Sequence, residues 1–283
     1  MVIKEIIAKS HKALEESGNE NPMFEANLIV RHYLNLAPID VVLFADKDVS
    51  EDSEKKIKEA VDKRIKNQPI QYILNSQEFM GLEFYVDENV LIPRQDTECL
   101  VETVLEKYQN KGFTMLDIGA GSGCISVSIA HFNKKAYVRG IDKSLEAVKV
   151  ATKNASLNNV EKRVSFECFD VFSFEGFGKV DAIVSNPPYI ETDEIEKLDS
   201  CVKDYEPILA LDGGKDGLDF YTHIIKIAPK LLNKGGRLFF EVGHNQSDAV
   251  SKLMCEFFED IEINKDFCGI KRVVLGKLKS ELA

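Results

Sequence analysis

The segment LDIGAGSGCISVSIA, residues 116–130, predicts the architecture of most of the chain. It starts as the apolar end of a strand, turns through Gly119, Gly121 and Gly123, and continues as an apolar helix. Glycine permits positive φ angles and lets the backbone approach a ligand closely. A strand, a glycine-rich turn and a helix in this order are typical of the first βα unit of a nucleotide- or cofactor-binding α/β sheet.

Outward from this segment, strand-like and helix-like stretches alternate. This alternation predicts a parallel sheet with helices on both faces. The last two strand candidates lie too close together for a helical crossover, so we expect them to form an antiparallel edge. The predicted strands are 114–118, 137–142, 164–169, 180–185, 237–242, 260–265 and 271–277, and the predicted helices are 96–109, 122–132, 144–157, 217–232 and 246–258.

The N-terminal part of the chain has a different pattern. Residues 1–67 predict a small helical domain, because Ile3, Ile6 and Ile7 begin an apolar pattern with helical spacing. Residues 68–93 predict a linker, in which the stretch 71–92 is rich in β-branched and aromatic residues and is expected to form a β-hairpin. The α/β domain is then expected to occupy residues 94–283.

The composition predicts a globular protein without a membrane segment. Of the 283 residues, 44% are hydrophobic and 29% are charged, and no apolar run approaches the length that a membrane helix requires, roughly 18–20 residues. The N-terminal stretch MVIKEIIAKSHKALEES carries charge throughout and lacks the apolar core of a signal peptide. We therefore expect a cytoplasmic protein.

Charge and cysteine spacing argue against several kinds of site. The net charge of −11 is opposite to the basic face that proteins use to bind nucleic acid, so it favours a protein or small-molecule partner. The six cysteines are scattered without a CxxC pair or a nearby histidine cluster. They predict reduced thiols, with neither a disulfide framework nor a metal site.

Acidic residues refine the prediction for the glycine turn. The dinucleotide fingerprint GxGxxG would need glycine at position 124, where the chain has Cys124. Asp142 ends the next predicted strand, where a carboxylate can hold ribose hydroxyls, and Asp170 follows the strand after that, where it can contact the edge of an adenine. This set suits S-adenosylmethionine (SAM) better than NAD, because SAM has no pyrophosphate for a helix N-terminus to bind and Asp117 would repel one.

The stretch DAIVSNPPYI, residues 181–190, ends a buried strand with Asn186, Pro187, Pro188 and Tyr189. This fourth strand is expected beside the first, so the turn should face the cofactor. The Asn186 side-chain oxygen and the Pro187 carbonyl can accept two hydrogen bonds from one planar NH₂ group, and Tyr189 offers an aromatic face. The turn predicts methyl transfer to a carboxamide or to the amine of adenine, driven by positioning and electrostatics.

Together the motifs resemble, almost from end to end, the bacterial release-factor glutamine N5-methyltransferases of the PrmC/HemK type. The Asn-Pro-Pro-Tyr turn is shared with DNA adenine-N6 methyltransferases, so it does not choose the substrate. The more specific matches are QPIQYI (68–73), EFMGLEF (78–84), VLIPRQDTECLVE (90–102), YEPILALDGGKDGLDFY (205–221) and GGRLFFEVG (235–243).

The resemblance implies a function and a fold. The chain would transfer a methyl group from SAM to the N5 side-chain amide of the glutamine in the Gly-Gly-Gln motif of class I peptide-chain release factors, leaving S-adenosyl-L-homocysteine. A Rossmann-like SAM-dependent methyltransferase domain, mostly parallel with an antiparallel C-terminal edge, would follow an N-terminal helical domain that holds the release factor. We expect a monomer when the protein is free, with no direct nucleic-acid contact.

The resemblance also assigns residues by position. The catalytic residues would be Asn186, Pro187 and Tyr189, and Pro188 would complete the glutamine pocket. No metal is implied. The SAM site would comprise Gly119, Ala120, Gly121, Ser122, Gly123, Asp142, Asp170, Val171 and Asn186.

The chain departs from the family pattern at two places. Gln95 and Asp96 stand where members commonly carry proline and glutamate, and Asn75 stands where they often carry glycine. We expect the proline loss to loosen the start of a helix and to leave the pocket intact. Arg94 and Glu206 are expected to brace that pocket without a chemical step.

The residues leave three alternatives open. The same chemistry could act on another protein glutamine, such as one in a ribosomal protein. It could act on adenine N6 of DNA, which predicts a basic groove and a target-recognition insertion. A catalytically silent SAM-binding protein that clamps release factors is the third, and the intact Asn186 to Tyr189 turn argues against it.

Overall fold

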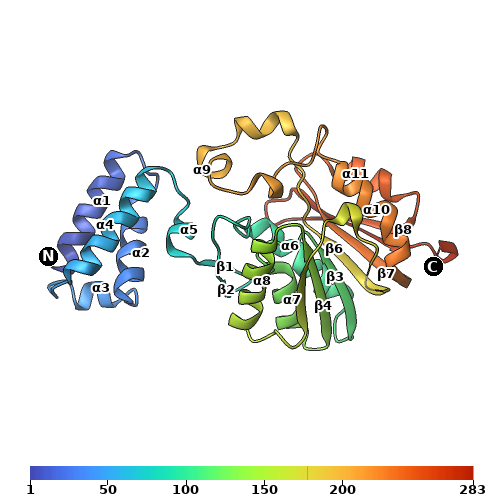
Figure 1. Cartoon of the computed structure of the whole chain (residues 1–283), viewed down its shortest axis with the longest axis horizontal. Coiled ribbons are helices and arrows are strands. Elements are labelled where there is room, and N and C mark those ends of the chain that lie inside the picture. The colour runs from blue at the N-terminus through green and yellow to red at the C-terminus, as the bar shows by residue number, and fades with distance from the viewer. Residues whose placement is uncertain (177, 283) are drawn as a thin grey trace. The chain divides into compact units, whose positions relative to one another are not determined.

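The computed structural model describes residues 1–176 and 178–282 (Figure 1). Contacts divide the chain into two units. The helical unit comprises Met1–Asn75 with Asp199–Tyr205, and the α/β unit comprises Ser76–Leu198 with Glu206–Ala283. In this division, residues 68–75 of the predicted linker belong to the helical unit and residues 76–93 to the α/β unit.

The helical unit is built from helices around an apolar core. Gly18 follows the first helix with φ +82°, a conformation that suits the end of a helix, and Pro22 begins the second. Ser50 caps α4 by accepting a hydrogen bond of 3.2 Å from the backbone N–H of Ser53. The helices are α1 (Ile3–Glu16), α2 (Pro22–Leu34), α3 (Asp40–Leu43), α4 (Glu51–Ile65), α5 (Ile70–Leu74) and α9 (Ser200–Lys203).

The predicted hairpin over 71–92 was wrong at its beginning, because Ile70–Leu74 forms α5. Tyr72, Ile73 and Leu74 are all buried, so this stretch has no alternation between a buried and an exposed face, as a half-buried strand would. Asn75 ends the helix with φ +51°. Glycine and asparagine are the residues that visit this left-handed conformation most readily, which explains why either can stand here.

The hairpin itself consists of β1 (Gln77–Phe79) and β2 (Leu82–Phe84), which pair antiparallel. Met80 and Gly81 join them, and both have positive φ angles, 54° and 70°. Positive φ at both central residues gives the twist that a two-residue hairpin turn needs. The Met80 N–H donates a hydrogen bond of 2.6 Å to Glu98 Oε1, which ties the hairpin to the start of α6 (Glu98–Lys107).

The α/β unit contains the predicted sheet. Its strand order, within the described residues, is β5-β4-β3-β6-β7-β9-β8; β3 to β7 pair parallel, and β9 and β8 form the antiparallel edge. The strands are β3 (Phe113–Ile118), β4 (Ala136–Asp142), β5 (Val164–Cys168), β6 (Val180–Ser185), β7 (Leu232–Glu241), β8 (Phe258–Lys265) and β9 (Lys271–Leu278). The adjacency of β3 and β6 confirms the expectation for the first and fourth strands.

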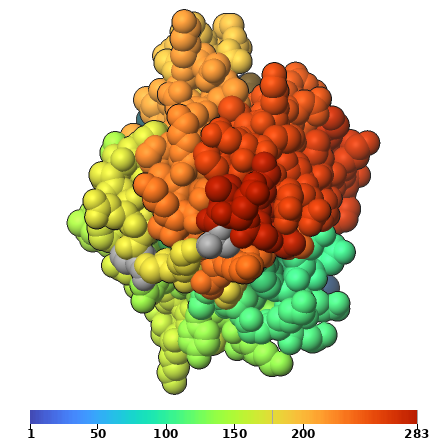
Figure 2. Space-filling model, turned by 90° about the vertical axis from the view of Figure 1, so that its right-hand side faces the viewer, coloured from blue at the N-terminus to red at the C-terminus, as the bar shows by residue number. Residues whose placement is uncertain are grey.

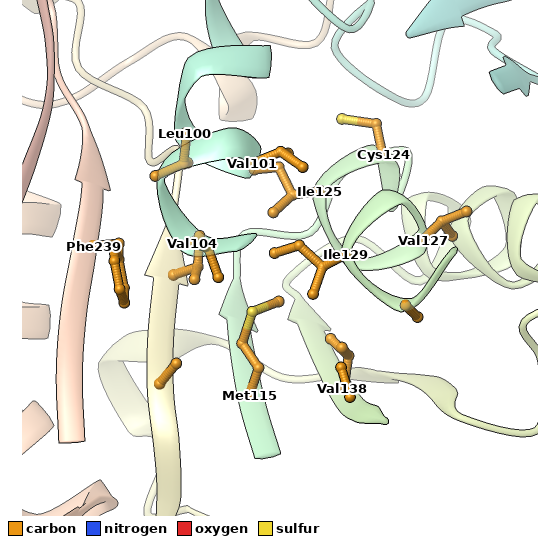
Figure 3. Close-up of a cluster of buried hydrophobic side chains, with 14 of the residues drawn as sticks. Leu100, Val101, Val104, Met115, Cys124, Ile125, Val127, Ile129, Val138 and Phe239 are labelled. Carbon is orange, nitrogen blue, oxygen red and sulfur yellow. The ribbon is translucent and has the colours of Figure 1, made fainter. Parts of the chain in front are cut away.

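Helices cover both faces of this sheet, because the buried strands are apolar on both sides. One core packs α6, α7 and α8 against the sheet, with Ile125, Ile129 and Met115 at its centre (Figure 3). The other core packs α10 and α11 against the opposite face, with Tyr221 and Phe240 in edge-to-face contact. These helices are α7 (Cys124–Phe132), α8 (Leu145–Leu157), α10 (Asp219–Leu231) and α11 (Ser247–Met254).

The C-terminal elements lie at the surface of the α/β unit. Figure 2 shows them in orange to red over much of one face, in keeping with β8 as the outermost strand. All six cysteines are free. Across residues 1–176 and 178–282, no helix is long and apolar enough to cross a membrane.

Candidate active site

A pocket of about 270 Å³ lies at the carboxyl ends of the strands of the α/β unit. It is centred where the strand order reverses between β3 and β6, the usual position of a ligand site in an open α/β sheet. Its lining includes Ile118–Ser122, Ile141–Ser144, Phe169–Phe172 and Ser185–Pro188 after successive strands, with Glu88–Leu91, Pro93, Arg94, Thr97, Pro207, Leu209, Ala210 and Phe220 around them.

The glycine turn follows β3 as predicted. Gly119 and Gly121 have φ angles of 76° and 53°, and a Cβ at either position would meet nothing within 4 Å. The backbone conformation, rather than crowding, therefore requires glycine at both positions. The N–H groups of Gly119 and Ala120 donate hydrogen bonds of 2.9 and 3.0 Å to the Ile141 carbonyl, which fixes the turn beside β4.

Gly123 serves the packing of the turn and is not among the residues that line the pocket. A Cβ at this position would lie 2.8 Å from the Phe166 ring and 3.0 Å from Ala151 Cβ. Gly123 therefore lets α7 begin close to α8 and β5. The structure brings the other predicted SAM residues to the pocket and leaves Gly123 behind it.

Asp142, at the end of β4, lines the pocket and also holds the turn. Its Oδ2 accepts a hydrogen bond of 2.9 Å from the Gly121 N–H, and its Oδ1 accepts one of 2.8 Å from the Ser144 N–H. Burial raises the pKa of Asp142, and these two hydrogen bonds oppose that shift. One carboxylate thus connects the two loops that follow β3 and β4.

Asp170, after β5, has the opposite electrostatic setting. The Phe172 N–H donates a 3.0 Å hydrogen bond to Oδ1, and Lys143 Nζ lies 3.0 Å from Oδ2. Chiefly because of the Phe172 N–H and the Lys143 ammonium, the pKa of Asp170 falls below its ordinary value. Asp170 therefore presents a charged carboxylate at the pocket.

Two buried polar side chains support the turn from behind. Asn154 Nδ2 donates hydrogen bonds of 2.9 Å to the carbonyls of Ser122 and Tyr85, so it joins the turn to the chain that leaves the hairpin. Asp117 is completely buried, accepts a 2.6 Å hydrogen bond from Ser126 Oγ, and leaves Oδ1 without a partner among the described residues. Burial raises the pKa of Asp117 to about 7.

The Asn-Pro-Pro-Tyr turn begins where β6 ends beside β3. Ser185 Oγ donates a 2.6 Å hydrogen bond to the Ile118 carbonyl, which places Asn186 at the switch point. Asn186 Nδ2 donates a 3.3 Å hydrogen bond to Thr97 Oγ1. Asn186, Pro187 and Pro188 all line the pocket together with the glycine turn.

Tyr189 is placed differently from its prediction. It was expected to offer an aromatic face to the substrate, but it is not among the lining residues; it packs against the core formed with α10 and α11. Its carbonyl accepts a 2.9 Å hydrogen bond from Gln246 Nε2, and burial raises the pKa of its phenol to about 12. Tyr189 anchors the turn from behind because its ring fits against the second core.

Arg94 and Glu206 were expected to brace the pocket, whereas no role was predicted for Thr97 or Phe220. Arg94 and Thr97 lie on the segment before α6, and Arg94 Nη2 lies 2.5 Å from Oε1 of the buried Glu206. Burial raises the pKa of Glu206, and Arg94 opposes the shift. The only earlier signal for Thr97 and Phe220 was their place in the motifs at 90–102 and 205–221.

His244, in the loop after β7, is exposed and lies outside the pocket. Within the described part of the chain, no group of three or more histidine, cysteine, aspartate or glutamate side chains could hold a metal ion.

Comparison with protein families gives two matches. Residues 5–74 match the PrmC N-terminal domain, and residues 94–203 match the methyltransferase small domain. Among solved structures, a methyltransferase from Pyrococcus furiosus is 19% identical with a TM-score of 0.51, over 71% of this chain and 90% of that one. That likeness supports the methyltransferase fold.

Curated relatives match nearly the whole chain. A release factor glutamine methyltransferase from Clostridium acetobutylicum is 40% identical over 98% of this chain and 98% of its own length. Proteins of the same name from Thermodesulfovibrio yellowstonii and Geobacter sulfurreducens are 41% and 39% identical, over 90% and 98% of this chain and over 93% and 96% of their own lengths. The similarity spans both units.

Proposed function

The chain belongs to the release factor glutamine methyltransferase family, whose members are SAM-dependent methyltransferases, and from this premise we propose its substrate. We propose that it methylates the side-chain nitrogen of the glutamine in the Gly-Gly-Gln motif of class I peptide-chain release factors. The observation that carries the substrate is the 40% identity to a release factor glutamine methyltransferase over 98% of this chain. The pocket that Asn186 and Pro187 share with the glycine turn supports methyl transfer to an amide nitrogen.

The residues of this pocket fit SAM. The side-chain-free surface of Gly119 and Gly121 leaves room for a ligand, while Asp142 and Asp170 supply carboxylates for hydroxyl and amino groups. Ala120, Ser122 and Val171 would complete the contact. SAM, when bound, supplies a methyl group on a positively charged sulfur. Gly123 would act indirectly, by letting α7 pack closely.

Asn186 and Pro187 would orient the substrate amide. The Asn186 Oδ1 and the Pro187 carbonyl are acceptors that can take both N–H groups of one carboxamide. An amide nitrogen is a weak nucleophile, so catalysis depends on holding it in line and stabilising the positive charge that develops on it. Pro188 would shape the wall of the glutamine pocket, and Tyr189 would hold the turn rigid.

We further propose that the protein acts in the cytoplasm as a monomer that contacts the release factor and not nucleic acid. The net charge of −11 supports a protein partner. The helical unit would hold the release factor away from the chemistry.

Mass spectrometry of a release factor after incubation with SAM and the protein tests the proposal. We expect one added methyl group on the Gly-Gly-Gln glutamine, and a rate at least about 100-fold lower with Asn186→Ala, because that change removes one of the two acceptors. Asn245→Ala, at an exposed asparagine in the loop after β7, is the matched control. Methylation of a ribosomal-protein glutamine or of DNA adenine instead would overturn the substrate.

A further inference from the structure

Glu241 is a buried carboxylate that the proposed mechanism leaves without a task. It is the last residue of β7 and is 2% exposed. Its Oε2 has no hydrogen-bond partner within residues 1–176 and 178–282. A buried ionisable group without full pairing is costly, so its position calls for an explanation.

The neighbours of Glu241 are the residues that hold the substrate-facing amide. β6 and β7 pair with Ser185 opposite Phe240, so the next residues, Asn186 and Glu241, lie side by side at the strand ends. The Thr97 hydroxyl and the Asn186 carboxamide, as hydrogen-bond donors, lower the pKa of Glu241. Asn186 Nδ2 also donates to Thr97 Oγ1 at 3.3 Å. Glu241, Thr97 and Asn186 thus form a cluster behind the pocket, and Thr97 and Asn186 also line it.

The donor and acceptor capacities of these groups fix the direction of the hydrogen bonds. An ionised carboxylate can only accept, whereas a hydroxyl can donate one hydrogen bond and accept others. If the Thr97 hydroxyl donates its hydrogen bond to Glu241, the lone pairs of Oγ1 remain to accept a hydrogen bond from Asn186 Nδ2. Both protons of the Asn186 NH₂ group then have partners behind the pocket, and Oδ1 is left to face the substrate.

We propose that Glu241 is a positioning residue that, through Thr97 and directly, holds the Asn186 carboxamide with Oδ1 toward the substrate amide. This inference rests on the proposed function, because it gives a reason for that orientation. A glutamine or protonated glutamate at position 241 could donate to Asn186 Oδ1 or to Thr97. The Asn186 amide could then turn over and present NH₂, which repels the N–H groups of a substrate.

Within the cluster, Glu241 is the group whose charge can change near pH 7. Burial raises its pKa to about 7, and Arg272 opposes that shift while Asp96 adds to it. Burial also raises the pKa of the Tyr189 phenol and the Cys124 thiol, each to about 12, so both stay neutral near pH 7. The groups that face Glu241 are Asp96, Cys99, Cys124, Tyr189, Tyr221 and Arg272.

NMR of the full chain with isotope-labelled asparagine tests the inference without any substrate. The Asn186 side-chain signal is identified by its loss in Asn186→Ala. We expect this signal to shift between about pH 6 and about pH 8, as Glu241 ionises, and the shift to be absent in Glu241→Gln. Glu262→Gln, on β8 and paired with Lys107, is the matched control and should keep the shift. A pH-independent Asn186 signal, or one unchanged by Glu241→Gln, overturns the inference.

Methyl-transfer kinetics provide the second readout. We expect Glu241→Gln and Thr97→Val to lower kcat by about 10- to 100-fold, with SAM affinity close to that of the unmodified chain and no loss of melting temperature. Thr97→Ser, which keeps the hydroxyl, should restore the rate. Equal losses in Thr97→Ser and Thr97→Val would overturn the relay. Failure of the unmodified chain to methylate release factor would overturn the proposed function alone, since the NMR result does not depend on it.

Discussion

At the scale of single residues, Asp142 combines two tasks in one carboxylate. Each of its oxygens accepts a backbone hydrogen bond, from Gly121 or from Ser144, and the same side chain lines the pocket. Only a carboxylate offers two acceptor oxygens at this length; asparagine offers one oxygen and an NH₂ group. Asparagine at this position would therefore keep the shape of the side chain but place its NH₂ group against one of the two backbone N–H donors.

Asp142→Asn is predicted to weaken SAM binding by about 10- to 100-fold, because one hydrogen bond to a charged acceptor in the glycine turn is lost. Calorimetric titration with SAM measures this, since the chain has no tryptophan to report binding. Asp181→Asn is the control: its carboxylate accepts from the Thr114 N–H at 2.8 Å and is not among the residues lining the pocket. Equal losses in both variants would contradict the assignment.

Single residues differ in how far the sequence predicts their role. Asp142 ends one predicted strand and Asn186 follows another, and the carboxyl ends of parallel strands share one edge, so their meeting could be expected. Glu241 could not be singled out in this way. Its cluster joins it to Thr97 and Asn186, and the contact depends on how β6, β7 and the start of α6 pack.

At the scale of elements, the segment between β6 and α10 fixes the Asn-Pro-Pro-Tyr turn. Two backbone hydrogen bonds join the chain at Ile190 to the segment 211–213. The Gly213 N–H donates to the Ile190 carbonyl at 2.8 Å, and the Ile190 N–H donates to the Leu211 carbonyl at 3.0 Å. A Cβ on Gly213 would lie 2.7 Å from Tyr189 Cα and 2.8 Å from the Pro188 carbonyl oxygen. Two backbones meet here without room for a side chain.

Gly213→Ala is predicted to displace the turn, because the obstructing atoms are backbone and cannot rotate away. We expect a loss of about 1–3 kcal/mol in the free energy of unfolding and a larger loss of methyl transfer than of SAM affinity. Thermal unfolding, calorimetry and the methylation assay separate these effects. Gly112→Ala, where the nearest atom would lie 3.4 Å away, is the control and should change little. An active, stable Gly213→Ala protein would show that the turn does not depend on this contact.

Elements were predictable where the hydrophobic period was clear. The strand at 180–185 and the helices on both faces follow from alternation and from the glycine turn, and their bounds agree within a few residues. The short helix Ile70–Leu74 could not be predicted, because five residues give too little periodicity to separate helix from strand. Its burial against the helical core decided the conformation.

At the scale of the whole molecule, buried carboxylates make stability depend on pH. Burial raises the pKa of Asp117 and of Glu241 to about 7, so between about pH 4 and about pH 7 the folded chain keeps two protons that the unfolded chain releases. Stability therefore falls as pH rises through that window. Asp170 and Asp181 have lowered pKa values and act in the other direction, since their stabilisation is lost as pH falls below about 4.

The double variant Asp117→Asn with Glu241→Gln is predicted to flatten this dependence. Each buried carboxylate lowers the free energy of unfolding by about 1.4 kcal/mol per pH unit inside the window, and its substitution removes that decrease. The variant should therefore become progressively more stable than the unmodified chain toward about pH 8. Urea unfolding at steps between about pH 5 and about pH 8 measures the free energy of unfolding of both proteins. Asp248→Asn, at an exposed carboxylate paired with Lys271, should run parallel to the unmodified chain, because its lowered pKa lies outside the window. Parallel curves for the double variant as well would mean that neither buried carboxylate holds its proton in the folded chain.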